Sequence, residues 1–418
     1  MFKGICITSI LILLDTSASM HHDISAPGTS IGSATDLVQL SDGNLIISEH
    51  GGKIIKMSII DGIKDGSFAS VGAFLGTGPT DPACLKNSNI RNAGVDFLEV
   101  SNKVSGYTGD VIFALSQGRN KIVKLNSSGV CIDVLFPADL NGENFEIVGM
   151  EMRTIESEDH LFVVGRKRIS GTWYGYMYTK NLTAGIEKRC FTRKINYGGS
   201  FSQVLRHTKD IAVDDGNNIY VSRSGDIWKF PLTKSGVNYC AAYDASTGTP
   251  TYEQANNPAV DDISDCSVSD KHCYAYNIDI DPDDPSIMYV TSRKTHHMVQ
   301  KLEITDTALR PILAEWWKGE SHNFPTLSDE KVHFHNPRGI HVTSTNVWIT
   351  DSKPSIQYFE KDANLTWVAN FGQMLRRVDG AIRAIRAVVS DSSFTSGANF
   401  GYGYWNSGEG DNPKQIKN

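Results

Sequence analysis

The sequence repeats one unit along most of its length. Each unit starts with a short apolar stretch and continues through a polar turn rich in Asp, Gly and Asn to a second apolar stretch. A third follows after a basic or glycine turn. Such repetition constrains a fold more than any single motif, because each copy has to bury its apolar face against its neighbours. The copies span residues 34–58, 92–126, 146–168, 208–230, 275–303 and 336–360.

Within each unit, apolar and polar residues alternate, which is typical of antiparallel strands. Asp42-Gly43 and Gly216-Asn217-Asn218 separate two such stretches, and these residue types accept the positive φ of tight hairpin turns at little cost. A single small sheet cannot bury its own face, so the sheets have to stack. Radial stacking of the units predicts a six-bladed β-propeller as the main part of the fold.

The repeats resemble the NHL family of β-propellers, and Asn336-Pro-Arg-Gly339 resembles the usual start of an NHL blade. The resemblance covers roughly residues 33–372 and implies a mainly β protein. Six-bladed propellers include enzymes that bind a metal or cofactor around the central channel. A secreted, metal-dependent lactonase, lyase or sugar dehydrogenase is therefore one alternative for the function, although fold alone does not supply chemistry.

Histidines in the last two units are the candidate metal ligands of such an enzyme. His333 and His335 fall on one face of a strand, His341 is near them, and His296-His297 belong to the previous unit. Neutral imidazoles are good ligands for transition metals. The alternative is that these histidines make local hydrogen bonds only. The sequence has no nucleophile elbow, phosphate-binding loop or His-Glu-x-x-His motif, so no catalytic residue is assigned.

Asp279, Asp281 and Asp283 stand at alternate positions, as acidic residues do in a calcium-binding loop. The glycine and the distal Glu of an EF-hand are missing. Because the other repeats have a hairpin turn at this position, we expect the same turn here.

Beyond the last repeat the pattern changes to the period of a helix. Apolar side chains recur on one face of residues 372–394, with arginines mostly on the other, and a strand rich in Gly and aromatic residues is expected at 398–405. A helix followed by a strand belongs to an α/β unit, which needs a preceding strand. The apolar run at 5–14 is the unassigned candidate, since buried parallel strands are continuously apolar.

The residues after that run, Asp15-Thr-Ser17-Ala-Ser19, resemble the metal-ion-dependent adhesion site of the von Willebrand factor A family. The resemblance implies that Asp15, Ser17 and Ser19 bind a divalent cation, Mg²⁺ or Ca²⁺, as hard oxygen ligands. It also implies a partial α/β, Rossmann-like A domain at 1–23 and 373–418, with the six-bladed NHL-like propeller of residues 24–372 inserted between the metal loop and the first helix.

This order of parts resembles the PilY-type adhesins of type IV pilus tips. It implies an extracellular or cell-surface adhesion protein rather than an enzyme, binding a surface protein, a glycan or pilus subunits. The family's site also uses a Thr and an Asp from later loops, which the sequence does not include. We therefore expect the cation affinity of this chain to be weak.

The N-terminus can also be interpreted as a cleaved secretion signal. Residues 1–3 are a short basic segment, residues 4–14 form an apolar core, and residues 16–19 are small enough for cleavage. That interpretation leaves the helix and strand after the propeller unexplained. Both interpretations place the protein outside the cytoplasm.

Charge and cysteine content narrow the classes of function. The net charge of −7 and the absence of a dense Lys/Arg run argue against nucleic-acid binding. The run at 4–14 is too short to span a membrane. Of the seven cysteines, the six beyond this run favour three disulfides in an oxidising compartment, and Cys266 and Cys273 could close a small loop. Free thiols in a cytosolic protein are the alternative.

Overall fold

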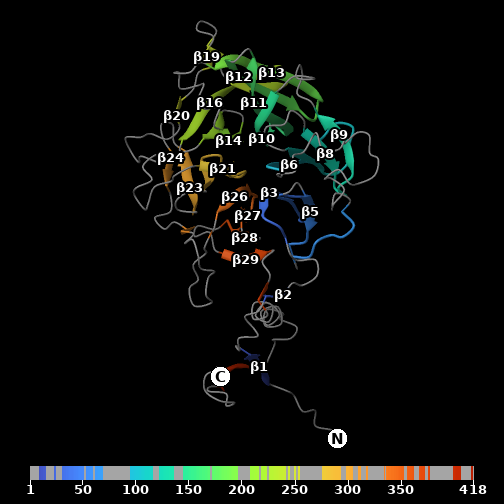
Figure 1. Ribbon diagram of the computed structural model, residues 1–418, viewed down its shortest axis with the longest axis vertical. Helices are drawn as coiled ribbons and strands as arrows, with labels where there is room; N and C mark the ends of the chain where they lie inside the picture. Colours follow the sequence, from blue (N-terminus) through green and yellow to red (C-terminus); the bar gives the residue numbers. More distant parts are fainter. Residues whose placement is uncertain are drawn as a thin grey trace. The chain divides into compact units, whose positions relative to one another are not determined.

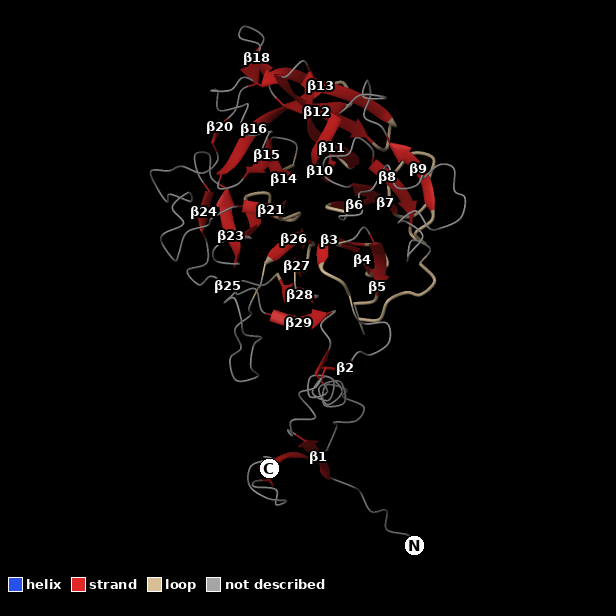
Figure 2. Ribbon diagram, viewed as in Figure 1, coloured by secondary structure: helices blue, strands red, loops and turns tan. Residues whose placement is uncertain are grey.

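The chain forms two compact units, Ile31–Phe371 and a second unit made of Met1–Ser30 with Gly372–Asn418. Wherever the structure describes the chain, its regular structure is β-strand (Figure 2). The computed structural model describes residues 9–15, 23–24, 31–50, 53–59, 62–68, 95–115, 122–135, 145–169, 172–195, 208–215, 218–223, 226–241, 243–244, 249–250, 253–254, 275–292, 298–304, 309–311, 317–318, 334, 336–352, 355–361, 367–371, 375–376, 399–405 and 416–417.

Six antiparallel sheets of three or more strands are described in the larger unit, and we call them blades 1 to 6 in chain order (Figure 1). Blade 1 has β3 (Ala34–Gln39), β4 (Leu45–Glu49) and β5 (Lys53–Met57). Blade 2 has β6 (Phe97–Ser101), β7 (Val111–Leu115), β8 (Ile122–Asn126) and β9 (Cys131–Leu135). Blade 3 has β10 (Phe145–Ile155), β11 (Glu158–Ile169), β12 (Thr172–Asn181) and β13 (Ile186–Ile195).

The remaining blades follow the same strand order. Blade 4 has β14 (Thr208–Val213), β15 (Asn218–Arg223), β16 (Asp226–Ser235) and β17 (Asn238–Ala241), and β20 (Glu253–Gln254) pairs with β16. Blade 5 has β21 (Ala275–Ile280), β22 (Ile287–Ser292), β23 (Met298–Ile304) and β24 (Leu309–Pro311), and β25 (Trp317–Lys318) pairs with β23. Blade 6 has β26 (Pro337–Val342), β27 (Asn346–Asp351), β28 (Ser355–Glu360) and β29 (Trp367–Phe371). A separate hairpin joins β18 (Tyr243–Asp244) to β19 (Thr249–Pro250).

The first strands of the blades form a closed ring. β3, β6, β10, β14, β21 and β26 each lie beside the next, and β26 lies beside β3. Figure 1 shows these strands around a common centre, with the later strands of each blade farther out. The six-bladed β-propeller predicted from the repeats is confirmed, and each repeat supplies the inner strands of one blade.

A hydrophobic cluster fills the boundary between each blade and the next. One apolar residue from the middle of each first strand enters one of six clusters of buried side chains. These residues are Leu37, Leu98, Met150, Ile211, Ile278 and Ile340, all at most 6% exposed. Burial of one such side chain contributes about 1.5–3 kcal/mol, so these contacts are the main force that holds the blades side by side.

Side-chain hydroxyls add hydrogen bonds across several boundaries. Ser222 donates to the carbonyl oxygen of Tyr276 (3.0 Å), Thr291 to that of Arg338 (2.8 Å) and Thr350 to that of Thr35 (3.3 Å). Each hydroxyl lies next to a β-bulge in the first strand of its own blade. The bond from Thr350 joins blade 6 to blade 1 and therefore closes the ring.

The smaller unit contains both ends of the chain. β1 (Ser9–Asp15) pairs in parallel with β31 (Asn399–Trp405), from Ser9 opposite Asn399 to Asp15 opposite Trp405. β31 also pairs with β32 (Ile416–Lys417), in antiparallel orientation. Strands are thus present at both chain ends where the sequence predicts them.

The predicted helix is wrong at its start. Leu375 and Arg376 form β30, which pairs with β2 (Asp23–Ile24). This pair ties the segment before the propeller to the segment after it, a long-range contact that takes precedence over the local helical period. The rest of the predicted helix, residues 377–394, lies outside the described residues.

One disulfide connects neighbouring blades. Cys190 on β13 is bonded to Cys240 on β17, 50 residues later, and Cys131 is also disulfide-bonded. The other predicted disulfide cysteines, Cys84, Cys266 and Cys273, lie outside the described residues. In the part of the chain that the structure covers, no helix has the length and apolar character needed to cross a membrane.

Candidate functional site

In each first strand, two positions, two residues apart, flank the apolar residue that enters an inter-blade cluster. In blade order the first position holds Asp36, Phe97, Gly149, Asp210, Asn277 and Gly339, and the second holds Val38, Glu99, Glu151, Ala212, Asp279 and His341. Most of these residues line one cavity of about 220 Å³, which we call the channel site.

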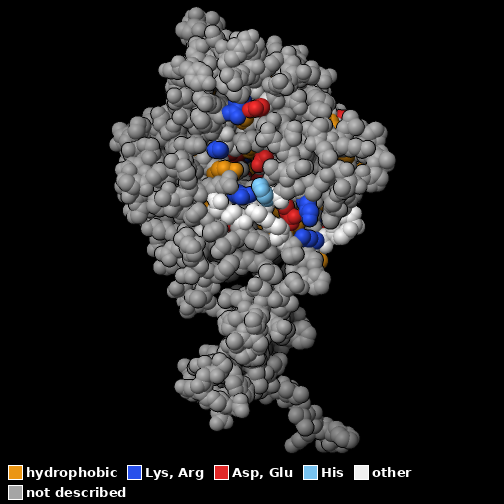
Figure 3. Space-filling view, in the orientation of Figure 1, with side chains coloured by type: hydrophobic (Ala, Val, Ile, Leu, Met, Phe, Trp, Pro, Cys, Tyr) orange, Lys and Arg blue, Asp and Glu red, His pale blue; other side chains and the backbone are white. Residues whose placement is uncertain are grey.

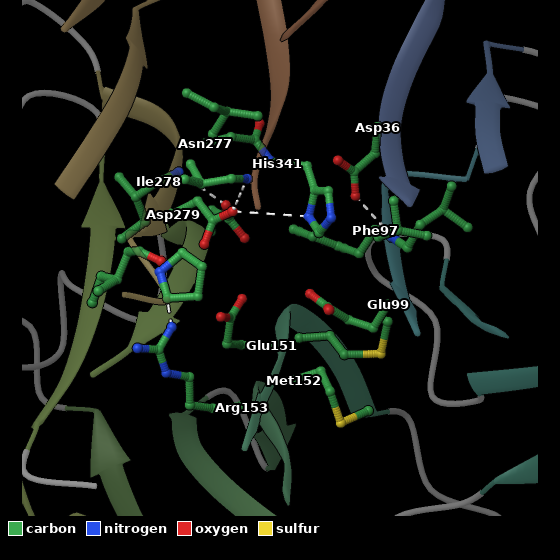
Figure 4. A pocket seen from close by; sticks show the side chains of 18 of the residues that line it. Asp36, Phe97, Glu99, Glu151, Met152, Arg153, Asn277, Ile278, Asp279 and His341 are labelled. Carbon is green, nitrogen blue, oxygen red and sulfur yellow. Dashed lines mark hydrogen bonds and ion pairs between the residues drawn. The ribbon is translucent and has the colours of Figure 1, made fainter. Parts of the chain in front are cut away.

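Five carboxylates from five different blades line the channel site: Asp36, Glu99, Glu151, Asp210 and Asp279. In a six-membered ring, blade 1 lies opposite blade 4, blade 2 opposite blade 5, and blade 3 opposite blade 6. Asp36 therefore comes from the blade opposite that of Asp210, and Glu99 from the blade opposite that of Asp279. Glu151 comes from the blade opposite that of His341. Figure 4 shows Glu99 and Glu151 on one side of the cavity, with Asp279 and His341 on the other.

Three of the five carboxylates, Asp36, Asp210 and Asp279, are held by backbone N–H groups of the following blade. Oδ2 of Asp36 accepts a hydrogen bond from Leu98 N (2.7 Å) and Oδ2 of Asp210 from Ile278 N (3.0 Å). Oδ2 of Asp279 accepts one from Val342 N (2.7 Å). These bonds fix the side chains at the blade boundaries, so the site is built into the ring rather than carried on loops.

Burial dominates the electrostatics of the site. It raises the pKa of Asp36, Glu99, Glu151 and Asp210 well above the usual range, and the negative charges of the other carboxylates add to this effect. Burial raises the pKa of Asp279 to about 7. A carboxylate that loses water and faces like charges favours its protonated form. The five groups therefore resist being ionised together.

His341 stands at the second position of blade 6. Its Nδ1 lies 3.9 Å from Oδ2 of Asp279. Burial lowers the pKa of the imidazole to about 4, so His341 is neutral at physiological pH. It brings no positive charge to balance the carboxylates.

Arg153 brings one positive charge to the edge of the site. Its Nη2 donates to Oδ1 of Asp215 (2.7 Å), and its Nη1 donates to the carbonyl oxygen of Ile280 (3.3 Å). The guanidinium lowers the pKa of Glu151 and Asp279, but burial outweighs it at both. Because the ion pair of Arg153 is with Asp215, its charge offsets the channel carboxylates only in part. Figure 3 shows acidic, basic and histidine side chains gathered in the middle of this face.

Asn277 adds an amide to the same wall. It is 4% exposed, it lines the cavity, and its Oδ1 has no hydrogen-bond partner. A buried acceptor without a partner costs about 1–3 kcal/mol, so a donor that reaches this oxygen from the cavity would be stabilised. Within the described ranges, no three His, Cys, Asp or Glu side chains form a group with the geometry of a metal site.

Of the metal ligands predicted from the sequence, His341 lines the channel, and most of the others are outside the described residues. Asp15 is the last residue of β1, whereas Ser17 and Ser19 are among the residues not described. His296, His297, His333 and His335 are also outside the described ranges, and only His341 of the predicted histidines reaches the channel.

The predicted turn at Asp281 is confirmed. Oδ1 of Asp281 accepts hydrogen bonds from the backbone N–H groups of Asp283 (2.9 Å) and Asp284 (3.3 Å). Lys361 Nζ lies 2.7 Å from both Asp281 and Asp283, so an ammonium group, not a calcium ion, bridges these two carboxylates. Asp279 belongs instead to the channel.

The sequence analysis did not identify Asp36, Glu99, Glu151 and Asp210 as site residues. The sequence does contain a signal for them. When the six first strands are aligned on their central apolar residue, a carboxylate stands directly before or directly after that residue in five of the six strands. Polar residues at alternate positions of a strand have the same pattern whether they face solvent or an enclosed channel.

Comparison with known proteins finds distant similarity to solved structures. No protein-family model and no curated protein matches the chain. Among solved structures, regucalcin from Agrobacterium tumefaciens, a calcium-binding protein, is 11% identical with a TM-score of 0.43, over 86% of this chain and 95% of that one.

Two propeller enzymes are similar to the same extent. Virginiamycin B lyase from Staphylococcus aureus is 11% identical with a TM-score of 0.40, over 84% of this chain and 86% of that one. A 6-phosphogluconolactonase candidate from Bacteroides uniformis is 9% identical with a TM-score of 0.41, over 80% of this chain and 83% of that one. At this level of similarity, none of these proteins carries an argument about the function of this chain.

Proposed function

We propose that the chain is an extracellular or cell-surface adhesion protein of the PilY type. In this proposal residues 1–23 and 373–418 form part of a von Willebrand factor A domain, and the propeller of residues 24–372 is inserted into it. Asp15, Ser17 and Ser19 bind Mg²⁺ or Ca²⁺, and an acidic group of a surface protein, glycan or pilus subunit completes the coordination of the ion.

The parallel pairing of β1 with β31 is the observation that carries the proposal. Parallel neighbours need a crossover connection, which in α/β units contains a helix. The segment between the propeller and β31 has the period of such a helix. Asp15 ends β1, and ligands of α/β sheets bind at the carboxyl ends of strands.

The first test is the N-terminal sequence of the mature protein from its producing cells. The proposal expects residues 9–19 to remain, because β31 needs β1 as its parallel partner. A mature chain that starts at or after Met20 would remove both the strand and the metal loop, and the adhesion proposal would fail.

The second test measures cation-dependent binding of the full chain to surface ligands. We expect binding in the presence of Mg²⁺ or Ca²⁺ to be lost with a chelator and in Asp15→Ala. Asp42→Ala, at a turn of blade 1, is the matched control and should bind as the unmodified chain does. Equal binding by Asp15→Ala would contradict the assignment of the metal loop.

A propeller enzyme is the second candidate, favoured by the group of buried carboxylates beside a neutral His341. Strongly shifted pKa values in a cleft are typical of acid–base sites. The candidate classes are lactonase, lyase and sugar dehydrogenase. Assays of lactone hydrolysis, elimination and sugar oxidation with the full chain test it. Activity that Glu151→Gln abolishes would favour the enzyme over the adhesin, whereas no turnover in any class would exclude it.

A further inference from the structure

We propose that the channel site binds a small organic amine through its ammonium groups. The residues that line it all belong to the larger unit, and the proposal does not depend on the adhesion function. It rests on the composition of the channel wall, on an unpartnered acceptor in that wall, and on the arrangement of the carboxylates around the ring.

The channel wall offers acceptors and lacks positive charge. Five carboxylates and the Asn277 amide line one cavity, and the guanidinium of Arg153 is already paired with Asp215. His341 is neutral because burial lowers its pKa. A ligand with N–H donors and a positive charge would supply what the wall lacks, and charge-assisted hydrogen bonds are among the stronger ones.

Asn277 provides a second observation, which does not involve the acidic groups and also favours a ligand with hydrogen-bond donors. It occupies the first position of β21, which corresponds to Asp36 in blade 1 and Asp210 in blade 4. In those blades the acceptor receives an N–H from the following blade, whereas Oδ1 of Asn277 receives none. An ammonium group in the cavity would provide the missing donor.

The arrangement of the carboxylates suits an organic cation better than a metal ion. A metal needs several ligands on one small sphere, and the described His, Cys, Asp and Glu residues contain no such group of three. The channel carboxylates instead come in opposite pairs, Asp36 with Asp210 and Glu99 with Asp279. A cavity of about 220 Å³ also exceeds the space of a single ion. A chain with an ammonium group at each end could contact both members of a pair.

The electrostatics predict how binding depends on pH. Apart from the five carboxylates, the charged or titratable groups at the cavity are Arg153, Asp215 and His341. An ammonium ligand favours ionised carboxylates, so binding releases protons from groups whose pKa burial has raised. Because the amine stays protonated throughout this range, affinity should increase from pH 5 to pH 8.

Isothermal titration calorimetry of the full chain tests the proposal with putrescine as the probe. Butanediol, which has the same length without charge, is the matched neutral compound, and CaCl₂ and MgCl₂ are titrated separately. We expect binding of putrescine, no heat with butanediol, and at least about tenfold weaker binding in Asp36→Asn/Asp210→Asn. Asn keeps an acceptor for the backbone N–H groups of Leu98 and Ile278.

Two controls make the outcome specific. Asp133→Asn, which removes an exposed charge on β9 of blade 2, should leave putrescine affinity unchanged. Asp15→Ala should also leave it unchanged, which separates this proposal from the adhesion function. If the double variant does not fold, the comparison of putrescine with butanediol on the unmodified chain still tests whether the positive charge of the ligand is recognised.

Three results would overturn the proposal. Putrescine that binds no better than butanediol would show that positive charge is not recognised. Equal affinity in Asp36→Asn/Asp210→Asn would place any bound amine elsewhere. Binding of Ca²⁺ or Mg²⁺ without binding of putrescine would reassign the channel to a metal ion.

Discussion

Gly339 of blade 6 lies directly against Asp36 of blade 1. A Cβ atom on Gly339 would be 2.5 Å from Oδ1 of Asp36 and 2.7 Å from its Cα. The two first strands that close the ring therefore meet with no room for a side chain. The same closure positions Asp36 in the channel site.

Gly339→Ala should loosen this closure. The added methyl group overlaps backbone as well as side chain, so the strands have to separate, at a cost of about 1–3 kcal/mol or more in the free energy of unfolding. Denaturant unfolding measures the loss. Gly66→Ala is the control, because nothing lies within 4 Å of the Cβ position at Gly66. If Gly339→Ala is as stable as Gly66→Ala, the boundary between blades 6 and 1 is not tightly packed in solution.

Thr350→Val should weaken the same boundary by removing a hydroxyl. Oγ1 of Thr350 accepts a hydrogen bond from Gly339 N (2.8 Å) and donates to the carbonyl oxygen of Thr35. Valine keeps the shape and leaves these buried groups unpaired, which costs about 1–3 kcal/mol. Thermal unfolding of Thr350→Val is compared with that of Thr233→Val, a control substitution at an exposed strand position. Equal stability of the two variants would mean that this bond contributes nothing.

Stability should depend on pH through Asp279. The ordinary pKa of an Asp side chain, which applies in the unfolded chain, is 3.8, and burial raises the pKa of Asp279 to about 7 in the folded protein. Between these values the folded chain binds more protons than the unfolded chain, so the free energy of unfolding falls as pH rises. Asp279→Asn removes this penalty, and its stability relative to the unmodified chain should increase from pH 4 to pH 7.

The control for that measurement is Asp42→Asn. Burial is the largest single effect on Asp42 and raises its pKa, but hydrogen bonds with Lys56 and Asn44 and the charge of Lys56 together outweigh it and hold the pKa below its usual value. Its contribution is already complete above pH 5, so the stability difference of this variant should stay constant from pH 5 to pH 8. If the free energy of unfolding changes with pH in the same way for Asp279→Asn and for the unmodified chain, the pKa of Asp279 is not raised.

Lys361→Met should destabilise blade 5 more than Asp283→Asn does. The ammonium of Lys361 is the charged partner of Asp281, whose side chain is 6% exposed, and also of Asp283, which is 57% exposed. Loss of Lys361 leaves a buried carboxylate without its counter-charge, at about 1–3 kcal/mol. Loss of the Asp283 charge costs at most about 1 kcal/mol. Chemical denaturation measures the loss of stability in both variants. A larger loss in Asp283→Asn than in Lys361→Met would contradict the prediction.

The sequence predicted the propeller well because each blade is specified locally. Alternating strands, turn residues and buried positions such as Leu37 and Ile278 recur in every unit, and stacking is the way such units bury their faces. Hydrophobic periodicity assigns residues to a buried or a polar face. It does not reveal that the polar face of six first strands encloses a common channel.

The channel residues were missed for this physical reason. Glu99 and Asp210 look like solvent-facing residues on an isolated strand, and only closure of the ring encloses them in the channel. The pairing of Leu375 with Ile24 was missed in a similar way, because contacts between distant segments leave no local period.

The pairing of β2 with β30 has a mechanical consequence. Tension applied beyond β1 and β31 first meets the parallel ladder between these strands and then the short pair of β2 with β30. Both have to separate before the pull reaches the blades. These two strand pairs therefore bear the load before the blades do, and the propeller keeps its shape until they open.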